Sequence, residues 1–205
     1  MNATNHSQSK LASNGVREII LASASKQRYD ILKRTGIPFV VEDSGYEEDL
    51  TLPLTPDELV KHLAEGKAAT VAARHQDALV IGADTIVVCD KEIFGKPLTS
   101  EQAREMLRKL SGKTHSILTG FAIIDPKTGD KVARTVETKV SFRALSDAEI
   151  DAYVATGEPL GKAGGYAIQG KGAQFVEKIE GEMDNVVGLP LQTLLEELAK
   201  LGITG

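Results

Sequence analysis

The chain has 205 residues, of which 41% are hydrophobic, and it carries a formal net charge of −5 at pH 7. This length and hydrophobic content exclude a chain that is disordered throughout, and they suit one compact domain or two closely joined lobes. The acidic balance and the lack of a long basic run argue against a nucleic-acid-binding protein, but a few well-placed cations could still bind an anionic substrate.

Residues 1–15 are polar and contain no apolar core, so they do not form a signal peptide, and we expect a flexible tail there. The folded domain is then expected over residues 16–205. No apolar stretch is long enough to cross a bilayer, and the single cysteine, Cys89, excludes an internal disulfide framework. Cys89 is expected to be a small core or edge residue. These features predict a cytoplasmic protein with no membrane partner and no nucleic-acid partner.

The first third of the chain alternates between strand and helix signals. A short apolar run with β-branched residues predicts a strand over residues 17–22, and a helix is expected over 26–34. A second strand, 38–41, precedes an acidic loop over 44–53. A capping box with proline at the first helical position then predicts a helix over residues 56–74.

The middle of the chain contains the longest apolar run, residues 79–89, which predicts a strand. A turn is expected at 90–92, and a capped helix should end near Leu110. Two strand signals, 114–124 and 134–142, flank a turn with proline and glycine and therefore predict a long hairpin.

The last quarter begins with a capped helix over 146–156 and a glycine-rich segment over 157–172. A strand over 175–179 and an amphipathic helix over 190–202 complete the chain. This mixture of alternating strands and helices with one hairpin predicts an α/β fold, in which a mixed sheet is flanked by helices.

The turn between the first strand and the first helix is a candidate phosphate site. Ser23 and Ser25 lie at the start of that helix, where backbone N–H groups and the helix dipole favour an anion. Arg28, in the first helical turn, could add a bidentate contact. Serine is also a preferred helix cap, so an ordinary cap is the alternative interpretation.

Lys67 lies within the apolar stripe of the helix that begins at residue 56, four residues after Leu63. An ammonium group on a core-facing stripe is costly unless it extends to water or meets an anion. Both interpretations remain open from the sequence, and a phosphate is the anion of interest.

Asp84 interrupts the apolar run LVIGADTIVV and is the strongest candidate for a functional residue. A carboxylate in such a strand is costly to bury unless a metal ion or another cation pairs with it. Either partner could help to activate a water molecule. The alternative is an aspartate at a strand end or bulge.

Three further charged residues lie in loops. Glu48 belongs to the acidic loop and could join Asp84 in binding Mg²⁺ or Mn²⁺, which accept carboxylate and phosphate oxygens, although a solvated loop explains it as well. Lys96 and Lys162 lie in glycine-bearing loops, where either could be an ordinary surface lysine. Together these charges predict a metal-assisted phosphate hydrolase without a Walker-type loop, a kinase signature or a complete dinucleotide fingerprint.

At these same residues the chain resembles the Maf family of nucleoside triphosphate pyrophosphatases, over roughly residues 18–200. The matching stretches are LASASKQR (21–28), the S-x-x-x-E loop (44–48), Lys67, GADTIVV (82–88), FGKP (94–97), LSGKTHSILTG (110–120), TGEPLGKAGGYAIQGKG (156–172) and NVVGLPL (185–191).

The resemblance implies cleavage of a nucleoside triphosphate to the monophosphate and pyrophosphate. It also implies an elongated α/β/α fold of the Maf and inosine-triphosphatase type, a divalent metal ion (Mg²⁺ or Mn²⁺) and a homodimer. Asp84 would accept a proton and, with Glu48, would serve the metal. The residues that would contact phosphates are Ser23, Ser25, Arg28, Lys67, Lys96 and Lys162. The positions that would set base preference are Gln27, Thr85 and Gln169.

Two stretches depart from the pattern of the dTTP/UTP-type members. Those members usually have Pro-Arg-Arg at positions 26–28, where this chain has Lys-Gln-Arg, and they usually have Asp at the position of Gly161. The first change removes a cation at Gln27. Ala-Asp-Thr and Tyr-Ala-Ile-Gln still favour the dTTP/UTP branch over the branch that acts on 7-methyl-GTP.

We therefore expect an enzyme for dTTP and UTP, or for modified pyrimidine nucleotides, that removes non-standard nucleotides. A second role in the arrest of cell division is open. The alternatives are a non-catalytic nucleotide-binding regulator of septum formation and a pyrophosphatase for purine nucleotides such as ITP or 7-methyl-GTP.

Overall fold

The computed structural model describes residues 17–204, so the tail expected over 1–15 lies outside the described residues. The chain forms a seven-stranded mixed sheet with the order β2-β1-β3-β5-β6-β7, and β4 pairs with β3 off this path. The strands are β1 Ile19–Ala22, β2 Val40–Glu42, β3 Leu79–Cys89, β4 Glu92–Phe94, β5 Thr114–Ile124, β6 Lys131–Phe142 and β7 Val176–Glu180. The α-helices are α1 Lys26–Lys33, α2 Pro56–Ala72, α3 Ser100–Leu110, α4 Asp147–Val154, α5 Met183–Val187 and α6 Leu191–Lys200.

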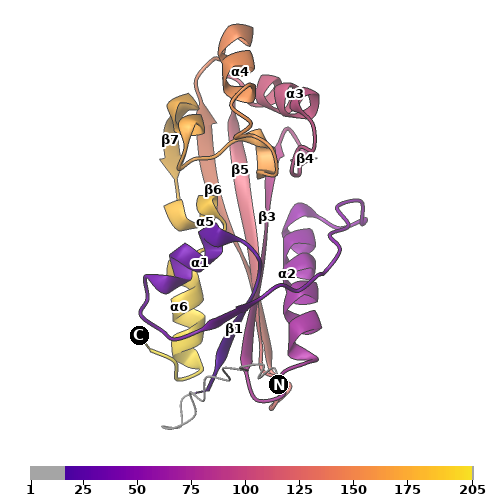
Figure 1. Ribbon diagram of the computed structural model, residues 1–205, viewed down its shortest axis with the longest axis vertical. Coiled ribbons are helices and arrows are strands. Elements are labelled where there is room, and N and C mark those ends of the chain that lie inside the picture. The colour runs from indigo at the N-terminus through magenta and orange to yellow at the C-terminus, as the bar shows by residue number, and fades with distance from the viewer. Residues whose placement is uncertain (1–16, 205) are drawn as a thin grey trace, which may run out of the picture.

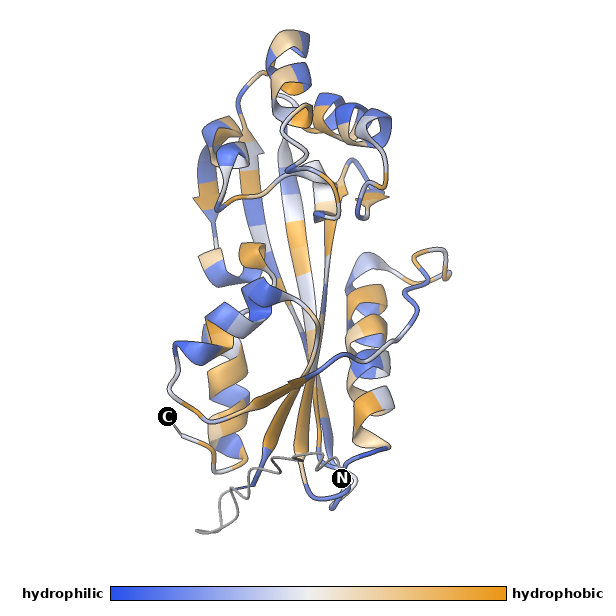
Figure 2. Cartoon of the chain, viewed as in Figure 1, coloured by the Kyte–Doolittle hydropathy of each residue, from blue (hydrophilic) through white to orange (hydrophobic). Residues whose placement is uncertain are grey.

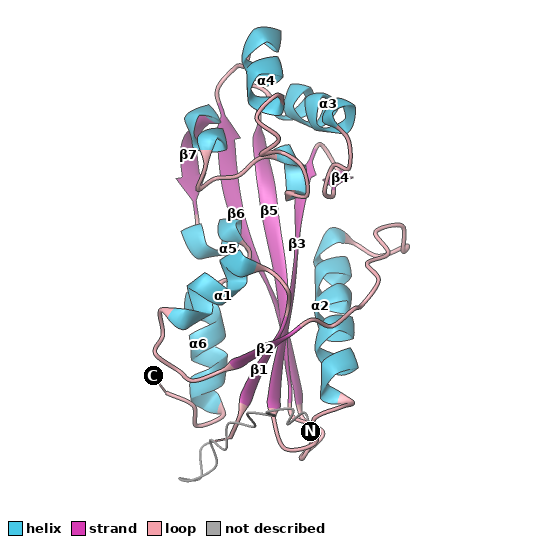
Figure 3. Cartoon of the chain, in the orientation of Figure 1, coloured by secondary structure: helices cyan, strands magenta, loops and turns pink. Residues whose placement is uncertain are grey.

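The molecule is elongated, because β3, β5 and β6 run along most of its length (Figures 1 and 3). β1 pairs in parallel with β2 and β3, whereas the pairs among β3, β4, β5, β6 and β7 are antiparallel. In the lower half of Figure 1, α2 covers one face of the sheet and α1 and α6 cover the other. The upper half carries α3, α4 and β7. The predicted mixed sheet flanked by helices is confirmed.

The lower half is a three-layer core, and the alternation of side chains along its strands explains the layers. In β1, Ile19 and Leu21 pack with α1 and α6, while Ile20 and Ala22 pack with α2. All four are buried, because successive side chains of a strand point to opposite faces and here both faces are covered. Figure 2 shows the result as hydrophobic strands enclosed between helices.

The upper half has a second core, formed around the far ends of β3, β5 and β6. Cys89 is buried in it, together with Leu107 of α3 and Tyr153 of α4. The expectation that Cys89 is a core or edge residue is therefore confirmed. Among the residues described, no helix has both the length and the apolar composition needed to cross a membrane.

Helix α2 approaches the sheet closely at two glycines, and this approach positions Lys67. A Cβ atom on Gly82 of β3 would lie 2.3 Å from the carbonyl oxygen of Ala64, and one on Gly120 of β5 would lie 2.3 Å from that of Val60. Since neither glycine has a side chain, the α2 backbone rests directly on the two strands. Lys67 is thereby held over the middle of β3.

Several element boundaries differ from the sequence-based expectation. The second strand is Val40–Glu42 rather than 38–41, α2 ends at Ala72, and the second arm of the hairpin begins at Lys131 rather than residue 134. The turn expected at 90–92 is confirmed as a two-residue turn at Asp90 and Lys91, and it leads into β4, a short strand that was not predicted. Helix α5 lies in a segment for which no element was predicted.

Candidate active site

A cavity of about 480 Å³ lies where the lower and upper halves meet. Its walls come from the β1–α1 turn, the loop before α2, the middle of β3 and the loops around residues 96, 162–169 and 186–188. Ten of the eleven residues predicted for the site line it, namely Ser23, Ser25, Gln27, Arg28, Glu48, Lys67, Thr85, Lys96, Lys162 and Gln169. Asp84, the eleventh, is 2% exposed and lies behind Lys67 rather than on the cavity wall.

The β1–α1 turn is built by serine hydroxyl groups. Ser25 is the N-cap of α1, and its Oγ accepts a hydrogen bond from the backbone N–H of Arg28 at 3.4 Å. Ser23 Oγ accepts from the backbone N–H of Ser25 at 3.2 Å. The cap alternative is therefore correct for Ser25, and the same cap directs the start of a helix at the cavity.

Arg28 has protein acceptors for all three guanidinium nitrogens. Nε donates to the carbonyl oxygen of Gly188 at 2.8 Å, Nη1 to Ser23 Oγ at 3.3 Å, and Nη2 to Thr85 Oγ1 at 3.3 Å. Burial lowers the pKa of Arg28, and the charges of Asp84 and Glu48 oppose that change. Arg28 therefore joins the β1–α1 turn, β3 and the loop before α6 while it also lines the cavity.

Thr85 is fixed from the side opposite Arg28. Its Oγ1 lies 2.9 Å from Thr119 Oγ1 in β5, and Thr119 donates to the backbone oxygen of Asn185 in α5 at 3.0 Å. Asn185 is fully buried and donates through Nδ2 to the carbonyl oxygen of Ile117 at 3.1 Å. This chain of hydrogen bonds links the α5 segment to the residue that follows Asp84.

Lys67 connects the two predicted metal-binding carboxylates. Lys67 is only 6% exposed, and its Nζ lies 2.5 Å from Asp84 Oδ1 and 2.7 Å from Glu48 Oε1. Lys96 Nζ adds contacts of 3.1 Å to both Glu48 oxygens. The sequence left open whether Lys67 extends to water or meets an anion, and the structure shows that its ammonium meets two carboxylates.

The two carboxylates have opposite pKa shifts. Burial raises the pKa of Asp84 above the ordinary aspartate value, and the charges of Lys67 and Arg28 only partly oppose this. Partial burial also acts to raise the pKa of Glu48, but Lys67 and Lys96 outweigh it and lower that pKa to about 2. The site thus holds one carboxylate that stays ionised and one suited to accept a proton.

The glycine-rich segment brings a second set of groups to the cavity. The backbone N–H of Gly161 donates to the carbonyl oxygen of Pro97, and that of Gly164 donates to Gly95, both at 3.1 Å. Gly164 has a φ of 70°, and a Cβ there would lie 2.9 Å from Val87. The two hydrogen bonds hold the loop that carries Lys162 against the loop that carries Lys96, and the close approach of Gly164 holds the same loop against β3.

Sequence reasoning missed several residues of the cavity wall, among them Tyr46 and Tyr166. Tyr46 lies so close to α2 that a Cβ on Gly66 would be 2.3 Å from its ring, and a glycine inside a helix was the signal for it. Tyr166 meets His115 Nε2 at 2.9 Å in the upper core. Its partner lies 51 residues away in the sequence, so no local pattern indicated it.

Among residues 17–204, no group of three or more His, Cys, Asp or Glu side chains is arranged to hold a metal ion. Glu48 and Asp84 form a pair rather than a complete ligand set. Both reach the single ammonium nitrogen of Lys67, so the two carboxylates converge on one position that already holds a positive charge.

Residues 18–201 match the family described as Maf-like protein. The dTTP/UTP pyrophosphatase of Pelotomaculum thermopropionicum is 47% identical over 91% of this chain and 98% of its own length. Proteins of the same name from Moorella thermoacetica and Bacillus cereus are also 47% identical, over 91% and 92% of this chain and 96% and 97% of their own lengths.

The fold is also found in a more distant protein. The Ham1 protein of Staphylococcus aureus aligns with a TM-score of 0.50 over 91% of this chain and all of that chain, at 11% identity, which shows likeness of fold alone. The family match covers nearly all the described residues, and the relatives align over almost their full lengths. The chain therefore belongs to the Maf family.

Proposed function

We propose that the chain hydrolyses dTTP and UTP to the nucleoside monophosphate and pyrophosphate. The observation that carries this proposal is the buried Asp84, held with Glu48 by Lys67 behind a cavity that is lined by further cationic side chains. The names of the relatives support it, since dTTP/UTP pyrophosphatases from several bacteria are about half identical to this chain.

The triphosphate lies in the part of the cavity where cations and a helix start converge. Lys96 and Lys162 approach from two loops that are hydrogen-bonded to each other, and Ser25 caps α1 beside them. Phosphate oxygens accept hydrogen bonds from ammonium groups and from backbone N–H groups at a helix start. Arg28 keeps its protein partners and contributes mainly its charge.

Asp84 accepts the proton of the attacking water molecule. A general base works best when its pKa approaches the working pH, and burial moves the pKa of Asp84 in that direction. Bound phosphates compete for the ammonium of Lys67, because they carry more charge than one carboxylate. Lys67 then contacts the substrate and leaves an oxygen of Asp84 free to accept the proton.

Glu48 and Asp84 would hold a divalent cation, Mg²⁺ or Mn²⁺, once the ammonium of Lys67 has moved from between them to the phosphates. The donor set is two carboxylates that reach one position, and Mg²⁺ is commonly held by one or two carboxylates together with substrate phosphates and water. When bound, the ion would neutralise phosphate charge and polarise a phosphoryl oxygen.

Base preference is assigned to Gln27, Thr85 and Gln169, all of which line the cavity. Gln27 lies at the start of α1, and its Oε1 accepts a hydrogen bond from Ser25 Oγ at 3.2 Å. Gln169 lies in the glycine-rich segment, which forms another part of the cavity wall. A pyrimidine ring held between these amides could exchange hydrogen bonds with both.

The test is a panel of dTTP, UTP, CTP, ITP and 7-methyl-GTP with Mg²⁺ or Mn²⁺, with the products separated by chromatography. The proposal expects the highest kcat/KM for dTTP and UTP. Faster turnover of ITP or 7-methyl-GTP would reassign the base, and binding without turnover of any nucleotide would favour a regulator.

The buried cysteine supports action in the cytoplasm, and the homodimer stays a prediction from the family resemblance.

A further inference from the structure

The loop that carries Gln169 is hydrogen-bonded to two side chains outside the cavity, Tyr153 of α4 and Glu158, which follows that helix. Gln169 lies inside a turn in which the backbone N–H of Gly170 donates to the carbonyl oxygen of Ala167 at 3.1 Å. Gln169 is an exposed side chain on a short loop, so its own contacts do not fix its position. Whatever orders this turn sets where the amide group of Gln169 lies.

One side of the turn is fixed by Tyr153. This tyrosine lies in α4, is 2% exposed, and its hydroxyl oxygen accepts a hydrogen bond from the backbone N–H of Ala167 at 3.0 Å. Its ring packs edge-on against Phe175, with 5.0 Å between the ring centroids. The hydroxyl group is therefore presented from a rigid part of the upper core.

The other side of the turn is fixed by Glu158, just after α4. Its Oε1 accepts from the backbone N–H of Lys171 and its Oε2 accepts from that of Gly172, each at 3.1 Å. Hydrogen bonds from backbone N–H groups to a carboxylate are among the strong ones. A Cβ on Gly170 would lie 2.2 Å from Glu158 Oε1, so glycine is needed there for the carboxylate to reach both donors.

The ionisation of Glu158 agrees with this geometry. Partial burial acts to raise its pKa, but hydrogen bonding to Tyr153 and to the two backbone amides outweighs burial and keeps the pKa below the ordinary glutamate value. The carboxylate is therefore charged, and it accepts from both amides, throughout the neutral range.

We propose that Glu158 and Tyr153 are positioning residues for substrate recognition, because together they hold the 167–172 turn and so place Gln169 against the base of the nucleotide. Neither side chain lines the cavity itself. The inference rests on the proposed function, because Gln169 matters only if a nucleotide base binds on that wall. It adds a second layer of residues through which base preference is set.

The test is Glu158→Gln, which replaces one acceptor oxygen by an amide group that faces a backbone N–H. KM for UTP should rise by about tenfold while kcat changes by less than about threefold, because the reacting phosphates are bound elsewhere. Glu158→Gln should add little to Gln169→Ala, because both act through the same contact. Tyr153→Phe, which keeps the ring and removes the acceptor, should give the same pattern.

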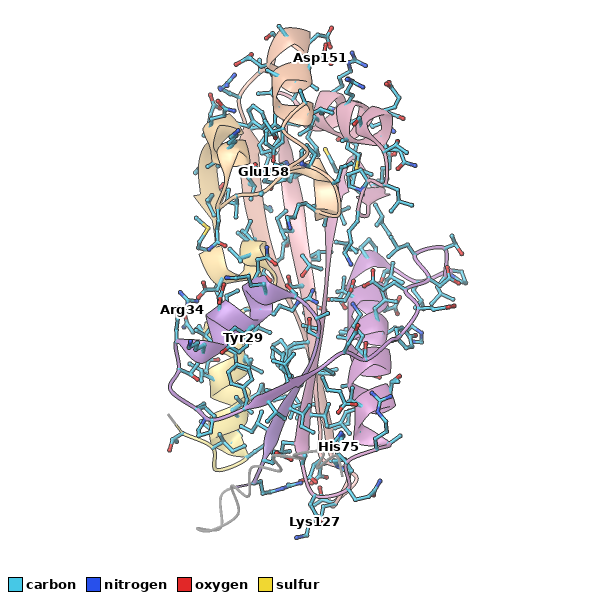
Figure 4. The ribbon with its side chains drawn as sticks, viewed as in Figure 1. Tyr29, Arg34, His75, Lys127, Asp151 and Glu158 are labelled. Carbon is cyan, nitrogen blue, oxygen red and sulfur yellow. The ribbon has the colours of Figure 1, made fainter. Side chains whose placement is uncertain are left out.

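The matched control is Asp151→Asn in α4, the helix that carries Tyr153. Asp151 pairs with Arg104 at 2.6 Å and lies at the far end of the molecule, whereas Glu158 lies closer to the middle (Figure 4). This control should leave kcat and KM unchanged. Additive effects of Glu158→Gln and Gln169→Ala, or a loss of kcat with unchanged KM, would overturn the proposal.

Hydrogen exchange of the enzyme without substrate separates this inference from the proposed function. The amides of Ala167, Lys171 and Gly172 should exchange faster in Glu158→Gln or Tyr153→Phe than in the parent enzyme. Unchanged exchange at all three amides would refute the positioning role of Glu158 and Tyr153, even if UTP is hydrolysed. Faster exchange in an enzyme that hydrolyses no pyrimidine nucleotide would support that positioning role and refute the proposed function.

Discussion

At the residue scale, Lys67 is the centre of the charge balance of the site. Its ammonium lies between Asp84 and Glu48 and is almost fully buried. Removing one partner of a buried ion pair leaves an uncompensated charge, but Lys67 has two carboxylate partners, so a neutral group of equal size at one of them still leaves the other. Conservative substitutions therefore distinguish a chemical role from a structural one here.

Asp84→Asn should lower kcat for UTP by about 100-fold or more, which is the usual contribution of a general base. The variant should stay folded, because asparagine has nearly the same volume and Glu48 still pairs with Lys67. Steady-state kinetics and circular dichroism check both statements. Asp130→Asn at the exposed hairpin tip is the control, and near-parental turnover of Asp84→Asn would remove Asp84 from the role of base.

His115 makes the stability of the protein depend on pH. Burial lowers its pKa to about 4, whereas an unfolded histidine titrates near 6.5. Between these values the unfolded chain binds the extra proton, so the free energy of unfolding is highest above pH 6.5 and falls as the pH decreases towards 4.

Urea unfolding at pH 7 and pH 4.5 tests this dependence. His115→Phe keeps an aromatic ring against Phe142 and Tyr166 but cannot titrate. The loss of unfolding free energy between the two pH values should be about 2–3 kcal/mol larger in the parent than in the variant. Equal losses would show that His115 is not buried in the neutral form.

At the scale of elements, the long helices and strands were predictable because periodicity, caps and glycines agree over many residues. The capping box at Thr55 and the apolar run of β3 are examples. The turn after β3 was expected, but the tight β3–β4 hairpin was not, because its turn places Asp90 and Lys91 at φ values of 50° and 68°. Such hairpin turns normally carry Asn-Gly or Asp-Gly, and a lysine in the left-handed region does not indicate one.

The approach of α2 to β3 leads to an element-scale prediction. Gly82→Ala should lower the free energy of unfolding by about 2–3 kcal/mol, because the new methyl group meets backbone atoms of Ala64 and Ala68 that cannot move separately. It should also lower kcat, since α2 carries Lys67. Chemical denaturation and UTP kinetics provide the measurements, with Glu177→Ala on β7 as the control. A change within 0.5 kcal/mol (about the range of ordinary surface substitutions) would show that α2 does not rest on Gly82.

At the scale of the whole molecule, the cavity lies between two cores that share the strands β3, β5 and β6. The sequence singled out the charged and serine residues of the site by their setting, whereas Gln27, Thr85 and Gln169 were named only from the family resemblance. It could not indicate that Lys67 pairs with both carboxylates, or that Tyr166 lies on the wall. Those contacts join segments far apart in the chain and depend on how the two halves meet.

A ligand that contacts both halves should stabilise the whole molecule. At 100 times its Kd, α,β-methylene-UTP, which cannot be cleaved between the α and β phosphates, should add about 2.7 kcal/mol and raise Tm by roughly 5–10 °C. Lys162→Ala should shrink this shift at the same ligand concentration, and Lys178→Ala on β7 should not. Differential scanning fluorimetry measures the ligand-induced shift in Tm. Equal shifts in both variants would place the triphosphate away from Lys162.

The most direct measurement is the identity of the products formed from UTP in the presence of Mg²⁺. Anion-exchange chromatography should show UMP and pyrophosphate in equal amounts, growing together from the first time point and at least about 100-fold more slowly with Asp84→Asn. UDP and single phosphate as the first products, or equal product formation by Asp84→Asn, would contradict a pyrophosphatase centred on Asp84.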